Sequence, residues 1–206
     1  MGRSNRPYHH SGKALRRTTG TRGAPKESFL IVCEGERTEP NYFQSFKLTS
    51  AAVRIIGRGY NTLSLVEETR LIVGEYRKEG IIYDQVWCVF DRDDFSSSFN
   101  AAVEKAEQFG FHAAYSNEAF ELWYLLHFIY FDSAITRSDY RTKLNQLLGR
   151  RYRKNSTDMY ELLLSRQSEA VRNAARLLDS YNTGNPNREN PSTTVHLLVE
   201  QLNRYL

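Results

Sequence analysis

Residues 83–95 read YDQVWCVFDRDDF, and this stretch sets the fold that the rest of the sequence predicts. Its apolar run, residues 86–90, is too short for a buried helix, and its β-branched and aromatic side chains indicate a strand covered on both faces. Three acids, Asp91, Asp93 and Asp94, follow at once. They should lie at the carboxyl edge of a sheet, which is where open α/β folds bind ligands. In extended backbone the first two would point to the same side, close enough to share a hard cation. A solvated acidic turn is the alternative.

A second strand that ends in an acid comes earlier in the chain. Residues 29–40 read FLIVCEGERTEP, and the apolar residues 29–33 predict another buried strand, which ends at Glu34. Gly35 lets the backbone turn sharply or approach a ligand closely, and Glu39 suits the first turn of the helix that follows. Two central strands that each deliver a carboxylate to the same edge form a stronger indication of a functional site than either strand alone.

The remaining periodicity predicts alternating strands and helices up to about residue 131. Such alternation favours right-handed crossovers and a mostly parallel, doubly wound sheet. The expected strands are residues 29–33, 53–56, 86–90 and 111–115, and the expected helices between them are residues 40–48, 62–78 and 98–109. From residue 132 onward we expect helices only, at residues 140–148, 159–164, 169–181 and 193–205, the last one capped by Ser192.

Composition and charge predict the layout of the chain. Residues 1–26 hold seven Lys or Arg and no acid, which leaves 21 basic and 24 acidic residues in the remainder. We therefore predict a basic, flexible arm over residues 1–26, an α/β domain over residues 27–135 and a helical extension packed on it over residues 136–206. The arm suits nucleic-acid phosphates, with a solubilising leader as the alternative. Because no apolar run reaches the roughly 20 residues that span a bilayer, we expect a cytoplasmic protein without membrane contact.

The segment at residues 116–131, SNEAFELWYLLHFIYF, predicts a deeply buried helix with Asn117 as its N-cap. Two acids lie in it, Glu118 in the first turn and Glu121 three residues later. Because a buried carboxylate needs a partner or a metal, either acid could face the Asp91 group. The alternatives are interaction with the helix dipole for Glu118 and an arginine or backbone partner for Glu121.

Two basic segments are candidates for nucleic-acid contacts. Arg58 lies in a glycine-containing loop ahead of a helix, where a phosphate could bind. A later loop carries Arg150, Arg151, Arg153 and Lys154 with Tyr152 between them, and basic residues with an interleaved aromatic suit a phosphate backbone and an unstacked base. An ordinary charged surface loop is the alternative. The two cysteines, Cys33 and Cys88, lie in predicted core strands and lack metal-ligand spacing, so we expect them to be packing residues.

Five motifs in order carry a resemblance to a known family. They are IVCEGERTEPNYF, GRGYNTLSLVE, VWCVFDRDDF, SNEAFELWYLLHF and NPSTTVHLLVE, and together they resemble the RloB-like family, small Toprim-type proteins associated with bacterial restriction and phage-defence loci. Glu-Gly after the first strand and Asp-x-Asp after a later one also resemble the Toprim domain itself. The resemblance spans residues 29 to the C-terminus. It implies a Toprim-like (Rossmann-like) mostly parallel sheet flanked by helices, with a helical C-terminal extension.

The resemblance also implies an activity and its residues. It implies a Mg²⁺- or Mn²⁺-dependent nuclease of anti-phage defence or abortive infection, acting on DNA or RNA, with tRNA among the candidate substrates and a partner protein from the same locus as a further expectation. Glu34, Asp91 and Asp93 would be catalytic and metal-binding, Asp94 a further ligand, and Glu34 either a ligand or the general acid/base. Glu39 is a further candidate site residue, and the last motif adds Asn190, Ser192 and His196. The alternative is a non-catalytic nucleic-acid-binding or regulatory subunit that retains the Toprim fold.

Overall fold

The computed structural model describes residues 27–59, 62–92, 98–181 and 183–206, and the predicted basic arm at residues 1–26 lies outside them. Five strands form one sheet in the order β2-β1-β3-β4-β5. β1 pairs in parallel with β2 and β3, β3 pairs in parallel with β4, and β5 runs antiparallel to β4. The strands are β1 (Ser28–Cys33), β2 (Ala52–Gly57), β3 (Gln85–Asp91), β4 (His112–Asn117) and β5 (Ser192–Thr193). The predicted α/β class and mostly parallel sheet are confirmed.

The two central strands are apolar along their length because both of their faces are covered. Phe29, Ile31 and Val89 belong to one hydrophobic core, whereas Leu30 and Cys88 belong to the other. This alternation is the period of two that a strand imposes on its side chains. The unbroken apolar runs that indicated buried strands therefore reflect two separate cores, one on each face of the sheet.

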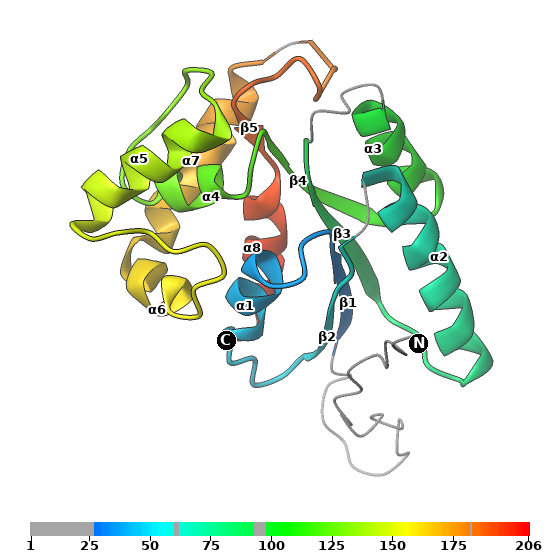
Figure 1. Cartoon of the computed structure of the whole chain (residues 1–206). Coiled ribbons are helices and arrows are strands. Elements are labelled where there is room, and N and C mark those ends of the chain that lie inside the picture. Colours follow the sequence, from blue (N-terminus) through cyan, green and yellow to red (C-terminus); the bar gives the residue numbers. More distant parts are fainter. Residues whose placement is uncertain (1–26, 60–61, 93–97, 182) are drawn as a thin grey trace, which may run out of the picture.

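One face of the sheet is covered by a layer of two helices, α2 (Thr62–Lys78) and α3 (Phe99–Gln108), which lie side by side (Figure 1). Leu65 and Val66 of α2 are fully buried against the sheet. On the outer side of this layer, Lys105 of α3 forms an ion pair with Glu67 of α2, with 2.7 Å between Nζ and Oε1.

The other face carries all the remaining helices in a thicker layer (Figure 1). One continuous core joins Phe29 and Ile31 of the sheet to Tyr140, Leu163 and Leu198 of the C-terminal region. The C-terminal helices therefore share a core with the sheet, while the predicted division at residue 135 stays a prediction. These helices are α1 (Thr38–Gln44), α4 (Glu121–Leu126), α5 (Arg137–Leu148), α6 (Met159–Leu163), η2 (Leu164–Arg166), α7 (Gln167–Asp179) and α8 (Val195–Asn203).

Two local predictions are wrong at the β4 end of the sheet. Asn117 is the last residue of β4 and not a helix cap, and α4 begins only at Glu121. The Asn117 amide instead donates to the carbonyl oxygens of Pro186 and Glu189, both at 3.0 Å. The prediction of helices only after residue 132 is also wrong, because Ser192 belongs to β5 and pairs with Asn117 of β4. Ser192 is therefore a strand residue and not a helix cap. Tertiary pairing with a segment 75 positions along the chain overrides the local helical pattern.

The chain connections define a switch point between β1 and β3. From β1 the chain passes through α1, on the thick-layer face, to β2, and from β2 it returns through α2, on the other face, to β3. The carboxyl ends of β1 and β3 therefore flank the position where the direction of winding reverses, and open α/β sheets bind ligands at such a position. Within the described residues no helix combines the length and apolar character needed to cross a membrane.

Candidate functional site

Glu34 and Asp91 lie side by side at this switch point. The backbone N–H of Asp91 donates to Oε2 of Glu34 at 3.0 Å. The backbone of Glu34 continues the ladder between the strands, because its N–H donates to the carbonyl of Val89 at 2.8 Å. The carboxylate that follows β1 is thus held directly against the last residue of β3. Asp93 and Asp94, the other two acids predicted here, lie outside the described residues.

A third acid, Glu39, reaches the same place from α1. Its side chain is buried, with 8% of the residue exposed, and its Oε2 has no hydrogen-bond partner among the described residues. The carboxylate lies against the Cα of Gly35, where a Cβ would overlap Oε2. A larger side chain at Gly35 would therefore displace the Glu39 carboxylate.

The fourth acid is Glu121, in the first turn of α4. Its Oε1 accepts a hydrogen bond of 3.1 Å from the hydroxyl of Tyr152. The charge of Glu121 raises the pKa of both Asp91 and Glu39, so it lies within electrostatic reach of each. The partner of Glu121 is thus a tyrosine, which was not expected from the sequence.

Burial and mutual repulsion act on these acids together. Burial raises the pKa of Asp91 well above its ordinary value, the charges of Glu39, Glu121 and Glu34 raise it further, and Arg137 opposes them. Burial likewise raises the pKa of Glu39, to which Glu121 contributes, while Lys154 and Arg137 oppose it. The cluster of Glu34, Glu39, Asp91 and Glu121, hereafter the carboxylate cluster, therefore brings four acids within electrostatic reach of Asp91 or of one another.

Arg137 is a residue of this site that the sequence did not single out. Its Nη2 lies 3.9 Å from Oδ2 of Asp91 and donates to the carbonyl of Glu118 at 3.1 Å. Arg137 is the first residue of α5, whose start is fixed by a capping box between Thr136 and Asp139. The capping signature could have located the helix start, but no local pattern connects that start with Asp91, 46 positions earlier in the chain.

The Glu118 carboxylate contacts Arg92 and is not one of the four acids of the carboxylate cluster. Its Oε1 lies 3.7 Å from Nη1 of Arg92, and 27% of its side chain is exposed. Arg92 in turn donates from Nε to Oδ1 of Asn187 at 2.7 Å. The Glu118 carboxylate is thus part of a polar contact between the end of β3 and the loop at residues 183–191.

The basic loop at residues 149–155 lies beside the carboxylate cluster. Oδ1 of Asn155 accepts from the hydroxyl of Thr38, and its carbonyl accepts from Asn41 Nδ2, both at 2.9 Å, so the loop docks on α1. Asn155 has a φ of 66°, a left-handed conformation that asparagine tolerates. Lys154, the preceding residue, is close enough to lower the pKa of Glu39.

The other predicted basic contacts differ in their surroundings. Arg151 and Arg153 are exposed, whereas Arg150 is paired with Asp158 at 2.6 Å. The loop with Arg58 follows β2, and Arg58 donates its backbone N–H to Cys33 at 3.0 Å, which brings it to the same edge of the sheet. Tyr152 is only 4% exposed, so the expectation that its ring stacks on an exposed base is wrong.

A comparison with known protein families identifies the family of this chain. A family model described as RloB-like protein matches residues 29–202. The chain belongs to the RloB-like family. The resemblance seen in the five motifs is thereby confirmed. No curated protein and no solved structure matches the chain significantly.

The last motif of this RloB-like chain lies next to the cluster and outside it. Ser192 is in β5, and Asn190 precedes it, followed by a cis Asn190–Pro191 peptide bond. Oγ of Ser192 and Oδ1 of Asn190 are both buried and have no hydrogen-bond partner among the described residues. His196 is buried in α8, and burial lowers its pKa against the opposing charges of Glu200 and Asp179. None of the three hydrogen-bonds with Asp91, Glu39 or Glu121 in the part of the chain that the structure describes.

The donor atoms of the carboxylate cluster fit a hard divalent cation. Over the described residues, no three His, Cys, Asp or Glu side chains converge closely enough to hold a metal ion. Mg²⁺ keeps several waters, however, and needs only one or two carboxylates from the protein. Glu34 and Asp91 are neighbours at the sheet edge and both carry carboxylate oxygens, and the buried Glu39 adds a third carboxylate within electrostatic reach of Asp91.

Proposed function

We propose that this RloB-like chain is a Mg²⁺- or Mn²⁺-dependent nuclease that hydrolyses phosphodiester bonds of DNA or RNA, with tRNA among the candidate substrates. The observation that supports the proposal best is the carboxylate cluster at the switch point, where Asp91 donates its N–H to Glu34 at 3.0 Å and burial raises the pKa of Asp91. Glu34, Glu39 and Glu121 come from three separate segments and each raises the pKa of Asp91, so acids converge here as they do around a bound cation.

Asp91 and Glu34 are the described residues that would hold the ion, joined by Asp93 and Asp94 in the proposal. When bound, the ion supplies Lewis acidity at the phosphoryl oxygen and activates a water molecule. Asp91 orients Glu34 through its backbone N–H. Glu34 then serves either as a further ligand or as the group that accepts a proton from water.

Glu39 and the cationic residues complete the proposed chemistry. Because burial raises the pKa of Glu39, this carboxyl is suited to hold a proton, which would remove one negative charge beside the phosphate that is being cleaved. Arg137, beside Asp91, and Lys154, beside Glu39, would stabilise the negative charge of the phosphate that is being cleaved. The exposed arginines of the basic loop would bind neighbouring phosphates.

A cleavage assay with a matched control tests the proposal. Purified wild type, Asp91→Asn and Asp132→Asn are each incubated with Mn²⁺ and with labelled single-stranded DNA, duplex DNA, RNA and tRNA. Asp132 is exposed, so the control makes the same chemical change away from the cluster. We expect Asp91→Asn to lose on the order of a thousandfold in rate while Asp132→Asn keeps the wild-type rate.

Two results would count against the proposal. Equal cleavage by wild type and Asp91→Asn would assign the activity to other residues or to a contaminant. If the wild type leaves every substrate intact but binds nucleic acid, the alternative of a non-catalytic binding or regulatory subunit replaces the nuclease proposal. A role in anti-phage defence, with or without a partner protein of the same locus, is part of the proposal and predicts that Asp91→Asn abolishes protection of cells against phage.

A further inference from the structure

Helix α5 carries three polar side chains in a row beside its buried stripe. Arg137, Arg141 and Asn145 are spaced four residues apart in α5, and this spacing places side chains one above another on the same face of a helix. The buried residues of the helix, Tyr140 and Leu144, belong to the core of the thick layer. The row of residues 137, 141 and 145 is hereafter the α5 face.

The first end of the α5 face is held at the carboxylate cluster. Nη2 of Arg137 lies 3.9 Å from Oδ2 of Asp91 and donates to the carbonyl of Glu118 at 3.1 Å. The capping box between Thr136 and Asp139 fixes the start of the helix at the same point. The α5 face therefore begins directly beside the proposed metal ligand Asp91.

The other end of the α5 face is held by the basic loop. Oδ1 of Asn145 accepts a hydrogen bond of 2.5 Å from the backbone N–H of Tyr152. The hydroxyl of Tyr152 in turn donates to Glu121 of the carboxylate cluster at 3.1 Å. Both ends of the α5 face are thus tied to the candidate site, so its middle has a fixed position relative to the cluster.

Arg141 lies in the middle of this face. The residue is exposed, and within the part of the chain that the structure describes no hydrogen bond or ion pair engages its guanidinium. Burial raises the pKa of the Tyr152 hydroxyl, and the charge of Arg141 opposes this rise. The guanidinium therefore lies within electrostatic reach of the hydroxyl that donates to Glu121.

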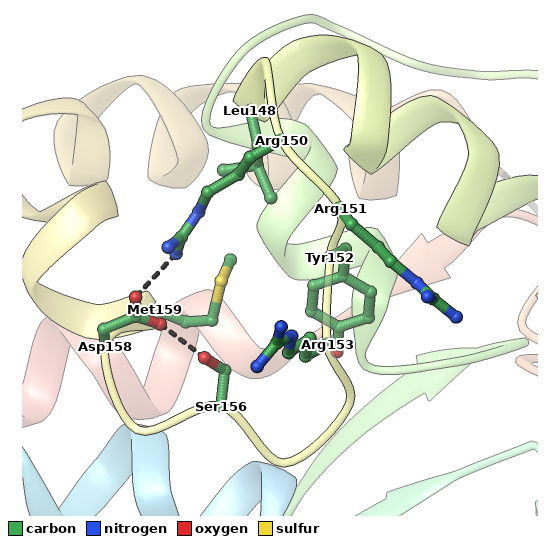
Figure 2. A pocket seen from close by; sticks show the side chains of 8 residues that line it. All are labelled: Leu148, Arg150, Arg151, Tyr152, Arg153, Ser156, Asp158 and Met159. Carbon is green, nitrogen blue, oxygen red and sulfur yellow. Dashed lines mark hydrogen bonds and ion pairs between the residues drawn. The ribbon is translucent and has the colours of Figure 1, made fainter.

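Two neighbouring cations differ from Arg141 because they are engaged within the protein. In Figure 2 the guanidinium of Arg150 turns toward Asp158, with which it forms an ion pair of 2.6 Å. Lys143, on another side of α5, places its Nζ over the ring of Phe131, 5.0 Å from the ring centroid. Arg141 thus offers to a ligand a charge that the protein itself does not use.

The spacing along α5 matches a nucleic-acid backbone. Residues four apart in a helix are separated by about 6 Å along its axis, which is comparable to the distance between successive phosphates of a strand. With one phosphate between Arg137 and the cluster, the next phosphate along the strand comes within reach of Arg141. A guanidinium suits this contact, because its planar fork can bind two phosphate oxygens at once.

We infer that Arg141 binds the phosphate next to the one held at the carboxylate cluster, so that the substrate strand lies along the α5 face. This inference rests on the proposed nuclease function and assigns to α5 the positioning of the strand. Because the contact is made to the backbone and not to a base, it should be independent of sequence and equal for DNA and RNA.

The test measures binding without metal, so it does not depend on cleavage. Wild type, Arg141→Met and Lys143→Met are titrated over a range of salt, in a chelator, with labelled single strands of DNA and RNA of on the order of ten nucleotides. Both substitutions remove one charge from α5 and keep an unbranched apolar side chain. Thermal melts confirm that the variants fold.

The expected result is a loss of one phosphate contact in one variant only. Arg141→Met should weaken binding about fivefold and reduce the slope of log K against log salt by about 0.7, the value for one contact to a single strand, on DNA and RNA alike. Lys143→Met should weaken binding by less than about twofold and keep the slope. Arg141→Lys should restore the slope, because the charge returns.

Several binding outcomes would overturn the inference. They are a wild-type slope in Arg141→Met, equal losses in Arg141→Met and Lys143→Met, and a wild type that binds neither strand. A loss confined to RNA would also overturn it, because the contact would then be to the 2′-hydroxyl and not to the phosphate. A wild type that binds with the expected slopes but never cleaves would overturn the nuclease proposal alone.

Cleavage kinetics with Mn²⁺ then place the contact along the strand. Arg141→Met should raise KM about fivefold and leave kcat within about twofold, because a phosphate beside the reacting one is bound equally in the ground and transition states. Arg137→Met should lower kcat, since Arg137 lies beside Asp91. An equal loss of kcat in both variants would move Arg141 to the reacting phosphate and overturn its assignment to the neighbouring one.

Discussion

Both edges of the sheet carry one Asp and one Glu at the ends of β1 and β3, but the surroundings of these acids differ between the two edges. At the amino edge, Asp84 precedes β3, and its Oδ2 accepts from the N–H and the hydroxyl of Ser28 at 2.9 Å and 2.7 Å. Glu27, which precedes β1, accepts from Gln85 at 2.6 Å and from the hydroxyl of Tyr205. At the carboxyl edge of the same two strands, Glu34 directly follows β1 and Asp91 is the last residue of β3.

The difference lies in what surrounds each acid. Neutral donors satisfy the carboxylates of the amino edge, so these acids fix the register of β1 and β3. At the other edge, burial together with the charge of Glu39 raises the pKa of Asp91, and the charges of Glu121 and Glu34 raise it further. An acid at a strand end is thus structural or functional according to its neighbours, and matched substitutions at the two edges separate the two roles.

The largest expected contrast is in activity. Glu34→Gln should lower the rate of nucleic-acid cleavage by on the order of a thousandfold, because it removes a charge next to Asp91, the proposed metal ligand. The same change at the amino edge, Glu27→Gln, should alter the rate by no more than about threefold, since Glu27 contacts only structural partners. Initial rates with Mn²⁺ decide the matter, and a Glu27→Gln variant as inactive as Glu34→Gln would break the comparison.

Next in size is an opposite effect on stability. In a chelator at neutral pH, Asp84→Asn should lower the free energy of unfolding by about 1 kcal/mol, because its exposed hydrogen bonds to Ser28 weaken. Asp91→Asn should leave it unchanged or raise it by about 1 kcal/mol, because a repelled charge is removed from the cluster. Urea unfolding measures both. A clear loss of stability in Asp91→Asn would mean that this acid, like Asp84, is held by structural partners.

A smaller effect is the pH dependence of the stability advantage of Asp91→Asn over wild type, and its sign can be derived. Burial raises the folded-state pKa of Asp91 and Glu39 above the ordinary values of 3.8 and 4.5. In the window above the ordinary values, the folded wild type binds more protons than the unfolded chain, so its stability falls as pH rises through this window. The stability advantage of Asp91→Asn over wild type should therefore be largest at neutral pH and shrink toward pH of about 5.

Taking the difference in stability between wild type and Asp91→Asn cancels the contributions of other titrating groups. Burial lowers the pKa of His127 to about 4 and lowers that of His196, so both destabilise the fold as pH falls below their ordinary value of 6.5. These contributions are the same in wild type and Asp91→Asn and cancel in the difference. A difference that does not change with pH would show that the charge of Asp91 is already compensated in the metal-free fold.

The smallest effect is expected at Tyr152, whose neutral hydroxyl donates a hydrogen bond to Glu121 at the carboxyl edge. Tyr152→Phe keeps the ring and removes the hydroxyl that donates to Glu121 at 3.1 Å. Stability should fall by about 0.5 kcal/mol, and cleavage should change by only a few-fold, because the carboxylate itself remains. Thermal melts and initial rates test this. A loss of activity comparable to that of Glu34→Gln would assign the hydroxyl a direct part in the reaction.

Much of the fold and the two central acids follow from local sequence. The apolar runs that precede Glu34 and Asp91 are short, β-branched and bounded by polar residues, so strand, burial and edge position can all be deduced from them. The helices of the thin layer were likewise predictable, because α2 and α3 each bury one stripe against the sheet and expose the rest.

The parts that were missed depend on contacts between distant segments. Asn117 resembles a helix cap in sequence, but the loop at residues 186–189 takes its amide and β5 extends its strand. Arg137 reaches Asp91 only because the C-terminal helices pack on the sheet, and Tyr152 is buried because its loop docks on α1. Local propensity carries no information on such pairings.

The most direct test of the carboxylate cluster is a calorimetric titration of Mn²⁺ into wild type, Asp91→Asn and Asp84→Asn without nucleic acid. We expect wild type and Asp84→Asn to bind Mn²⁺ with the same affinity, and Asp91→Asn to bind at least about tenfold more weakly, because the substitution removes one of the few carboxylates an ion of this kind needs. Equal Mn²⁺ affinity in Asp91→Asn and wild type would contradict the assignment of the carboxyl edge as the metal site.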